Sequence, residues 1–236
     1  MELTCVSGYW PVENKHGDKY NDWFKYTLRI NAPYIFFVNK KGFEIIKEYR
    51  KDLPTHYIEF DIPKFYTYKY KNKMKTDSVH CPSVELNLIW NEKIFFIQRA
   101  FESNPFDSNY FIWIDAGICT FRDTMPPSKP FPNKYNIKFL PKNKFIYSSS
   151  QSPVFDNRFI SDSDNQHLYH HVSGTYILHK DIINNFTELY KKYFDNLVDG
   201  KRLWTDQVIL THIYKDHSHM FCKICDGYGT ILKLLY

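Results

Sequence analysis

Residues 110–117 read Tyr-Phe-Ile-Trp-Ile-Asp-Ala-Gly, and this stretch is the strongest indication of the fold in the sequence. The apolar run from Tyr110 to Ile114 is typical of a central strand that is covered on both faces. The strand ends in an acid, Asp115, followed by a small residue and Gly117. Ligands of open α/β sheets bind outside the carboxyl ends of the strands. We therefore expect Asp115 in a functional site, although an acid here could also simply cap the next turn.

The clearest helix precedes this strand. It follows Ser83, which can cap it, and its apolar stripe is Leu86, Ile89, Trp90, Ile94, Ile97, Ala100 and Phe101. Lys93 lies seven residues after Leu86 and therefore falls on the same inward stripe. A lysine there either extends its amino group to solvent or meets a buried anion. Spacing alone favours the extension to solvent.

The rest of the chain alternates short apolar runs with helical stretches. We expect strands at 3–7, 33–38, 56–60, 144–149 and 172–179, and helices at 18–30, 43–49, 181–194 and 205–215. This alternation is typical of an α/β fold with a central, mainly parallel sheet flanked by helices. No linker or repeat divides the sequence, so we expect one domain over residues 1–236.

Two residues in the second half of the chain, Gly174 and Asp206, lie at positions that bear on a site. Gly174 interrupts a predicted strand with a residue that lets a ligand or another backbone approach closely. Asp206 lies in the first turn of the helix at 205–215, where an acid complements the helix dipole and needs no functional explanation.

The composition is that of an ordinary globular protein, with 43% hydrophobic and 24% charged residues. No stretch approaches the roughly 20 apolar residues of a membrane span. The first residues lack the basic and apolar regions of a signal peptide, so we expect a cytoplasmic protein. Its Lys, Asn and Ile content indicates an A/T-rich genome, bacterial or viral, and for a virus the compartment is the host cytoplasm.

Two segments suggest other functions. Lys64 to Lys75 interleaves lysines with aromatic residues, a mixture that can bind single-stranded nucleic acid, but one run of twelve residues favours a lysine-rich loop or the rim of an anion site. His217, His219, Cys222 and Cys225 could in principle hold zinc. If the segment is a strand, however, the two cysteines point to opposite faces and cannot share a metal. We therefore expect neither nucleic acid nor zinc.

The order of several motifs resembles the HtrL/YibB family. The similar segments are Pro82 to Leu86, Trp90 to Lys93, Ala100, Asn104-Pro105-Phe106, Phe111 to Gly117, Val172-Ser173-Gly174 and Asp206-Gln207. The residues from 82 to 117 are the specific part. The sequence departs from the family pattern at Pro82-Ser83-Val84-Glu85, where relatives have Pro-Glu, and at Ser7 to Trp10, where relatives more often have an acidic-Gly-Arg turn.

The resemblance implies a glycosyltransferase of the GT-A type, a Rossmann-like unit that binds a nucleotide-sugar. In that fold, a D-x-D motif after a central strand holds a divalent cation and the donor. Asp115-Ala116-Gly117 occupies this place, but Gly117 replaces the second acid and leaves dependence on Mn²⁺ or Mg²⁺ open. His217 or His219 could supply a further ligand.

The resemblance also implies roles for the remaining residues. Gly8 and Tyr9 are expected at the nucleotide base, and Asp115 and Gly117 at the donor. Lys93 is expected at the donor phosphates, and Gly174 in the sugar or acceptor pocket. Asp206 is the preferred catalytic carboxylate, ahead of Asp162, Asp164 and Asp226, because an inverting transfer needs a base.

The implied reaction moves a sugar from a nucleotide-sugar, with UDP as the first choice of nucleotide, to a hydroxyl of a glycan or protein. Two alternatives remain at this point. One is a module that binds a nucleotide or sugar without turnover, and the other is a basic-aromatic nucleic-acid-binding protein. The sequence does not indicate the oligomeric state.

Overall fold

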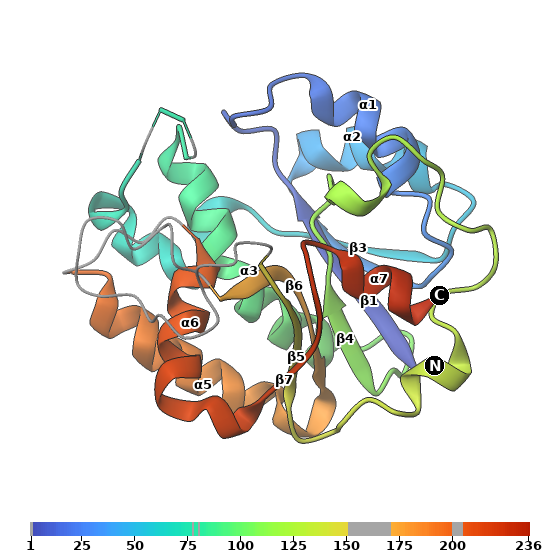
Figure 1. The fold of residues 1–236 in the computed structure, drawn as a ribbon. Helices are drawn as coiled ribbons and strands as arrows, with labels where there is room; N and C mark the ends of the chain where they lie inside the picture. Colours follow the sequence, from blue (N-terminus) through green and yellow to red (C-terminus); the bar gives the residue numbers. More distant parts are fainter. Residues whose placement is uncertain (1, 77, 80, 151–170, 200–204) are drawn as a thin grey trace.

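A computed structural model describes residues 2–76, 78–79, 81–150, 171–199 and 205–236. The described strands form one seven-stranded sheet in the order β3-β2-β1-β4-β6-β5-β7 (Figure 1). The strands are β1 Leu3–Tyr9, β2 Tyr34–Val38, β3 Thr55–Glu59, β4 Tyr110–Trp113, β5 Phe145–Ser149, β6 Val172–His179 and β7 Phe221–Asp226. Neighbours run parallel except that β6 is antiparallel to β4 and β5. The expected α/β class with a mainly parallel sheet is confirmed.

Helices cover both faces of this sheet (Figure 1). They are α1 Lys19–Thr27, α2 Lys40–Arg50, α3 Val84–Ser103, α4 Lys134–Ile137, α5 Lys180–Leu197, α6 Asp206–His217 and α7 Thr230–Leu235. The described residues also form the 3₁₀ helices η1 Ile62–Lys64, η2 Tyr66–Lys73, η3 Cys119–Phe121 and η6 Ser218–Met220. One core cluster lies under α3, α5 and α6, and a second lies under α1, α2 and α7. Every residue of β2 and of β4 is buried, as a strand between two cores requires.

The order of the strands creates a crevice beside β1. The chain builds β1, β2 and β3 outward in one direction and then returns through α3 to place β4 on the other side of β1. The direction of building therefore reverses between β1 and β4. A ligand-binding crevice is expected outside the carboxyl ends of the strands at such a point.

Helix α3 begins after Ser83 and carries Lys93 on the face toward this crevice. Ser83 caps the helix as predicted, because its Oγ accepts a hydrogen bond from the Leu86 amide at 3.2 Å. Lys93 is only 4% exposed, so its amino group does not extend to solvent as spacing alone favoured. Asp18, in contrast, precedes α1 without a capping side-chain bond.

The lysine-rich run at 64–75 is not the loop that its composition suggested. It forms η2, whose Tyr66 and Tyr70 hydroxyls donate to the Asp195 carboxylate on α5 at 2.6–2.8 Å. The aromatic side chains pack against the first core cluster, and Lys69 pairs with Asp195 at 3.7 Å. The rings therefore support the fold and are not arranged as an open platform for bases.

The C-terminal cysteines lie in β7, and their faces differ from the expectation. Both Cys222 and Cys225 pack against the second core cluster, because a register shift beside Lys223 breaks the alternation of the strand. Both thiols are free, and the described residues contain no trio of His, Cys, Asp or Glu that could hold a metal ion.

Between β4 and β5, residues Lys134–Ile137 form the single-turn helix α4. None of the helices in the described ranges is long and apolar enough to cross a membrane.

A buried glutamate on α3 holds the start of η2. The Glu92 carboxylate accepts hydrogen bonds from the amides of Tyr66 at 2.8 Å and Thr67 at 3.0 Å, and the side chain is fully buried. Burial raises the pKa of Glu92 to about 7, although the two amides lower it.

We expect this carboxyl to make stability dependent on pH. The folded protein keeps a proton that the unfolded chain releases, so stability from this group is fully present below about pH 4.5 and is lost as the pH rises to about 7. The loss is on the order of 3 kcal/mol. Urea unfolding across this window should show the loss in the wild type and in Glu85→Gln, an exposed control on α3, but not in Glu92→Gln. A parallel decline in all three would contradict the assignment.

Candidate functional site

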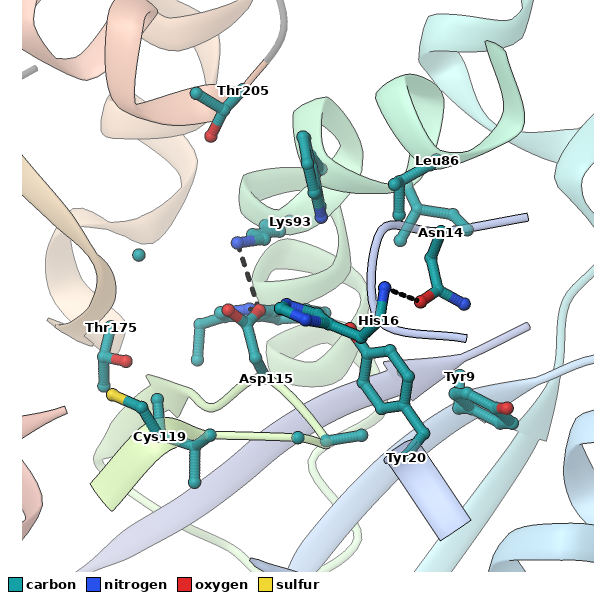
Figure 2. A pocket seen from close by; sticks show the side chains of 18 of the residues that line it. Tyr9, Asn14, His16, Tyr20, Leu86, Lys93, Asp115, Cys119, Thr175 and Thr205 are labelled. Carbon is teal, nitrogen blue, oxygen red and sulfur yellow. Dashed lines mark hydrogen bonds and ion pairs between the residues drawn. The ribbon is translucent and has the colours of Figure 1, made fainter. Parts of the chain in front are cut away.

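The crevice at the carboxyl ends of β1 and β4 is a cavity of about 760 Å³ (Figure 2). This volume lies in the range of small-molecule sites. Gly8, Tyr9 and Trp10 line it from the end of β1, and Asp115, Ala116 and Gly117 line it from the end of β4. Helix α3 contributes Leu86, Ile89, Trp90 and Lys93, and β6 contributes Gly174 and Thr175.

An ion cluster forms the floor of the cavity. The Lys93 amino group lies 3.1 Å from Asp115 Oδ1 and 3.5 Å from Asp206 Oδ1. The Lys93 side chain is 5% exposed, that of Asp206 is fully buried, and that of Asp115 is 44% exposed. The predicted Asp115, Lys93 and Asp206 thus come together from a strand and two helices, and the buried-anion explanation of Lys93 is confirmed.

The charges in this cluster stabilise one another. Burial alone would lower the pKa of Lys93, but the carboxylates of Asp115 and Asp206 outweigh it, and the pKa is raised. Burial raises the pKa of Asp206, against the lowering effect of the Lys93 charge. The ammonium is therefore held in its charged form, as the geometry requires.

Neighbouring groups fix the two carboxylates. Trp113 Nε1 donates to Asp115 Oδ1 at 2.7 Å, so Trp113 and Lys93 engage the same carboxylate oxygen. Thr205 Oγ1 donates to Asp206 Oδ1 at 2.8 Å, and the Tyr176 hydroxyl donates to Asp206 Oδ2 at 2.9 Å. Asp115 keeps Oδ2 for a ligand, whereas Asp206 has both oxygens occupied.

This environment does not suit the general-base role that we expected for Asp206. The residue is fully buried and does not line the cavity, and a base must reach the proton that it takes. Of the other carboxylates considered, Asp226 is exposed at the end of β7 and hydrogen-bonds Ser149 and Lys223. Asp162 and Asp164 lie outside the described residues.

Three predicted glycines permit close packing around the cavity. A Cβ at Gly174 would lie 3.4 Å from Lys93 Nζ and 3.6 Å from Asp115 Oδ2, so the strand passes directly over the ion cluster. A Cβ at Gly117 would lie 2.6 Å from the Tyr20 ring, and one at Gly8 would lie 2.6 Å from the Trp10 ring. Real Cβ atoms do not approach so closely, so Gly8 and Gly117 set the positions of these rings.

The rim opposite Lys93 is aromatic. Tyr9, His16 and Tyr20 line it, and Figure 2 shows Tyr9 and Tyr20 side by side near His16 and Asp115. Burial, together with the charges of Arg122, Lys15 and Lys19, lowers the pKa of His16 to about 4, so the imidazole is neutral at neutral pH. This rim offers ring faces and neutral hydrogen-bonding groups.

Arg122 and Lys15 are cavity residues that the sequence did not reveal. The Arg122 guanidinium lies 3.7 Å from the centre of the Trp23 ring, and its Nε donates to the Gly117 carbonyl at 2.9 Å. With Lys93 they bring three cations to the described part of the lining, against the carboxylate of Asp115 there and that of Asp206 behind Lys93. Such a lining suits an anionic ligand. In the sequence, Arg122 follows Gly117 by five residues, and this spacing matches no motif that would have indicated a site.

The two C-terminal histidines are not part of this site, which corrects our expectation. His217 ends α6 and His219 lies just before β7. Strand β7 runs parallel to β5, and β5 has the same direction as β4, so the start of β7 lies at the edge opposite Asp115. The six residues of β7 separate these edges by about 20 Å. His217, His219 and Asp115 therefore cannot share a metal ion.

The cavity can hold a divalent cation only together with a ligand that supplies further oxygen atoms. Among the described residues of the lining, Asp115 alone carries a carboxylate, and its contacts with Trp113 and Lys93 both use Oδ1. Mg²⁺ is commonly held by one or two carboxylates, with substrate phosphates and water completing the shell. A cation that arrives with a phosphorylated ligand therefore fits these residues, whereas a site built from protein ligands alone does not.

Comparisons with known proteins show similarity to a family. A family model described as "Bacterial protein of unknown function (HtrL_YibB)" matches residues 39–233. No curated protein matches the chain. One similar solved structure is 4-diphosphocytidyl-2C-methyl-D-erythritol synthase from Anaerococcus prevotii, which is 11% identical. The alignment covers 96% of this chain and 87% of that chain with a TM-score of 0.44, too low to support a functional argument.

We expect Lys93→Met to destabilise the protein by about 3–5 kcal/mol, because it leaves the buried Asp206 carboxylate without its cation. Lys93→Met/Asp206→Asn should recover part of this loss, since the amide carries no charge and its oxygen can still accept one of the two hydrogen bonds that Thr205 and Tyr176 donate to Asp206. Urea unfolding of the single and double variants measures this coupling. Strictly additive effects would show that the two charges do not stabilise each other.

Proposed function

The chain belongs to the HtrL_YibB family, and we propose that it transfers a sugar from a nucleotide-sugar to a hydroxyl of a glycan or protein. The observation that carries this proposal is the cavity at the carboxyl ends of β1 and β4. It combines ring faces, three cations and one exposed carboxylate at the point where the strand order reverses.

The lining suggests how a donor would lie. The aromatic rim of Tyr9, His16 and Tyr20 suits a nucleobase, which stacks on ring faces. Arg122 and Lys15 beside this rim suit the diphosphate, because a guanidinium pairs with phosphate oxygens in two-pronged geometry. The sugar would then lie toward Gly174, where the absence of a side chain leaves room above the ion cluster.

The ion cluster would hold the reacting end of the site rigid. We assign Asp206 to holding Lys93, and Lys93 to fixing Asp115 at the floor of the cavity. Asp115 would hold Mn²⁺ or Mg²⁺ together with the diphosphate. When bound, such a cation neutralises charge that develops on the leaving group.

The transfer itself is a substitution at the anomeric carbon. The acceptor oxygen forms a bond to this carbon while the bond to the diphosphate oxygen breaks. The electron pair leaves with the nucleoside diphosphate, and the proton of the acceptor hydroxyl passes to a phosphate oxygen of this leaving group. The main contribution of the protein is electrostatic, through Arg122, Lys15 and Lys93 around the departing charge.

Two other functions have less support. A module that binds nucleotide or sugar without turnover would use the same cavity, and an assay for released nucleoside diphosphate separates it from an enzyme. A nucleic-acid-binding role for residues 64–75 is disfavoured because Tyr66 and Tyr70 are held by Asp195.

We expect Asp115→Asn to abolish cation-dependent nucleotide binding. With Mn²⁺, a nucleoside diphosphate at 100 times its Kd should stabilise the wild type by about 2.7 kcal/mol in thermal unfolding. EDTA should remove this stabilisation, and Asp115→Asn should lack it. UDP and UDP-sugars are the first ligands to test.

Asp123→Asn is the matched control, because Asp123 is exposed nearby and does not line the cavity. Equal stabilisation of Asp115→Asn and wild type would remove the role of Asp115. If no nucleotide stabilised the wild type, the transferase proposal would fail.

We expect Arg122→Gln to weaken nucleoside diphosphate binding by roughly tenfold to a hundredfold, since a hydrogen bond to a charged group contributes about 1.5–3 kcal/mol. Separate titrations of wild type and variant with nucleoside diphosphate and with nucleoside show whether the loss of affinity comes from the phosphates. An equal loss of affinity for both ligands would place Arg122 at the base instead.

A further inference from the structure

An apolar and basic patch lies on α4, α7 and the segments beside them. Its apolar members are Phe139, Tyr135 and Leu234, whose exposed fractions are 87%, 62% and 47%. Its basic members are the exposed lysines Lys129, Lys134, Lys138, Lys142 and Lys233. We call this set the α4–α7 patch. Large apolar side chains exposed together in this way usually mark a surface that binds another molecule.

The backbone holds these side chains outward. Ile137 is buried in the second core cluster, which anchors α4 and turns Tyr135 and Phe139 to solvent. The Tyr110 hydroxyl donates to the Leu140 carbonyl at 2.7 Å and fixes the residues that follow α4. Asn136 Nδ2 donates to the Leu234 carbonyl at 2.8 Å, which joins α4 to α7 and places Leu234 in the same patch.

The charge around the apolar members is of one sign. Residues 124–144 contain five lysines and no aspartate or glutamate. The amino groups of Lys134 and Lys138 lie 5.4 and 5.8 Å from the centre of the Tyr135 ring, so cations and ring are presented side by side. Burial, and after it the negative charges of Glu2 and Asp181, raise the pKa of Tyr110, whose hydroxyl contacts Leu140. These two acids therefore lie at one border of the patch.

We propose that the α4–α7 patch binds the surface of a membrane that contains anionic lipid. Aromatic side chains favour the level of the headgroups, and apolar side chains inserted there gain from burial. Lysines near an anionic surface contribute about 1 kcal/mol each. Leu234 has no ring face on which a nucleic-acid base could stack, so the mixture of aliphatic, aromatic and basic groups favours lipid over nucleic acid.

The patch is separate from the cavity. The Phe131 amide donates to the Asn31 carbonyl just before β2, and Leu140 is tied to Tyr110 at the start of β4. The patch therefore lies at the amino ends of these strands, and the cavity lies at the carboxyl ends. Helix α7 begins just after Tyr228, a residue of the cavity lining, and runs to the C-terminus, which Figure 1 shows near the N-terminus. Binding to a membrane and binding to a nucleotide can be measured independently.

The test is co-sedimentation with vesicles of phosphatidylcholine alone and with vesicles that also contain phosphatidylglycerol. We expect binding only to the second kind, and weaker binding as salt is raised. Phe139→Ser should lower this binding by about tenfold, and Phe139→Trp should preserve it. Lys134→Gln and Lys138→Gln should each lower it roughly fivefold.

Lys40→Gln/Lys41→Gln is the charge-matched control, because both lysines are exposed on α2 outside the patch. It should bind anionic vesicles more tightly than Lys134→Gln/Lys138→Gln. Phe139 is exposed, so thermal unfolding should show that Phe139→Ser is folded.

The proposal is wrong if the wild type does not bind anionic vesicles at low salt, or if Phe139→Ser binds them as well as wild type. It is also wrong if only a single-stranded oligonucleotide, and no vesicle, is bound through these residues.

Discussion

The charged cluster of Lys93, Asp115 and Asp206 is the constraint around which the rest of the molecule is arranged. One ammonium is buried between two carboxylates from different elements, so α3, β4 and α6 must meet at one point. Buried charges are tolerated only when their remaining hydrogen bonds are made. Trp113, Thr205 and Tyr176 make them. The strand that carries Gly174 crosses directly over this cluster, since a Cβ there would lie 3.4 Å from Lys93 Nζ.

Much of this arrangement can be predicted from local patterns in the sequence. An apolar run that ends in an acid and a glycine placed Asp115 at the carboxyl end of a strand, and helical spacing placed Lys93 on an inward face. The partner of Lys93 could not be predicted by the same means, because Asp206 is more than 100 residues away and looks like an ordinary helix-start acid. Family resemblance, and not periodicity, brought Asp206 into the same site, and the structure then showed that it is buried.

The sequence predictions that the structure corrects also failed because they depend on contacts between distant parts of the chain. The histidines near residue 218 lie beside a strand whose direction depends on its pairing with β5, which no local pattern encodes. One register shift in that strand also changed the faces of Cys222 and Cys225. Arg122 was missed because its position depends on stacking against Trp23 from a different element. Periodicity predicts which face of an element is inward, but long-range pairing determines which inward groups meet.

The opposite placement of the cavity and the α4–α7 patch restricts the geometry of any acceptor. A molecule resting on a bilayer through Phe139 and Leu234 would stand with its parallel strands rising from the lipid. Strand β1 has seven residues, so the floor of the cavity would lie roughly 20 Å above the headgroups. A hydroxyl attached directly to a lipid headgroup could not reach that height. The accessible acceptors would be free in solution or would stand on a stalk several sugars or residues long.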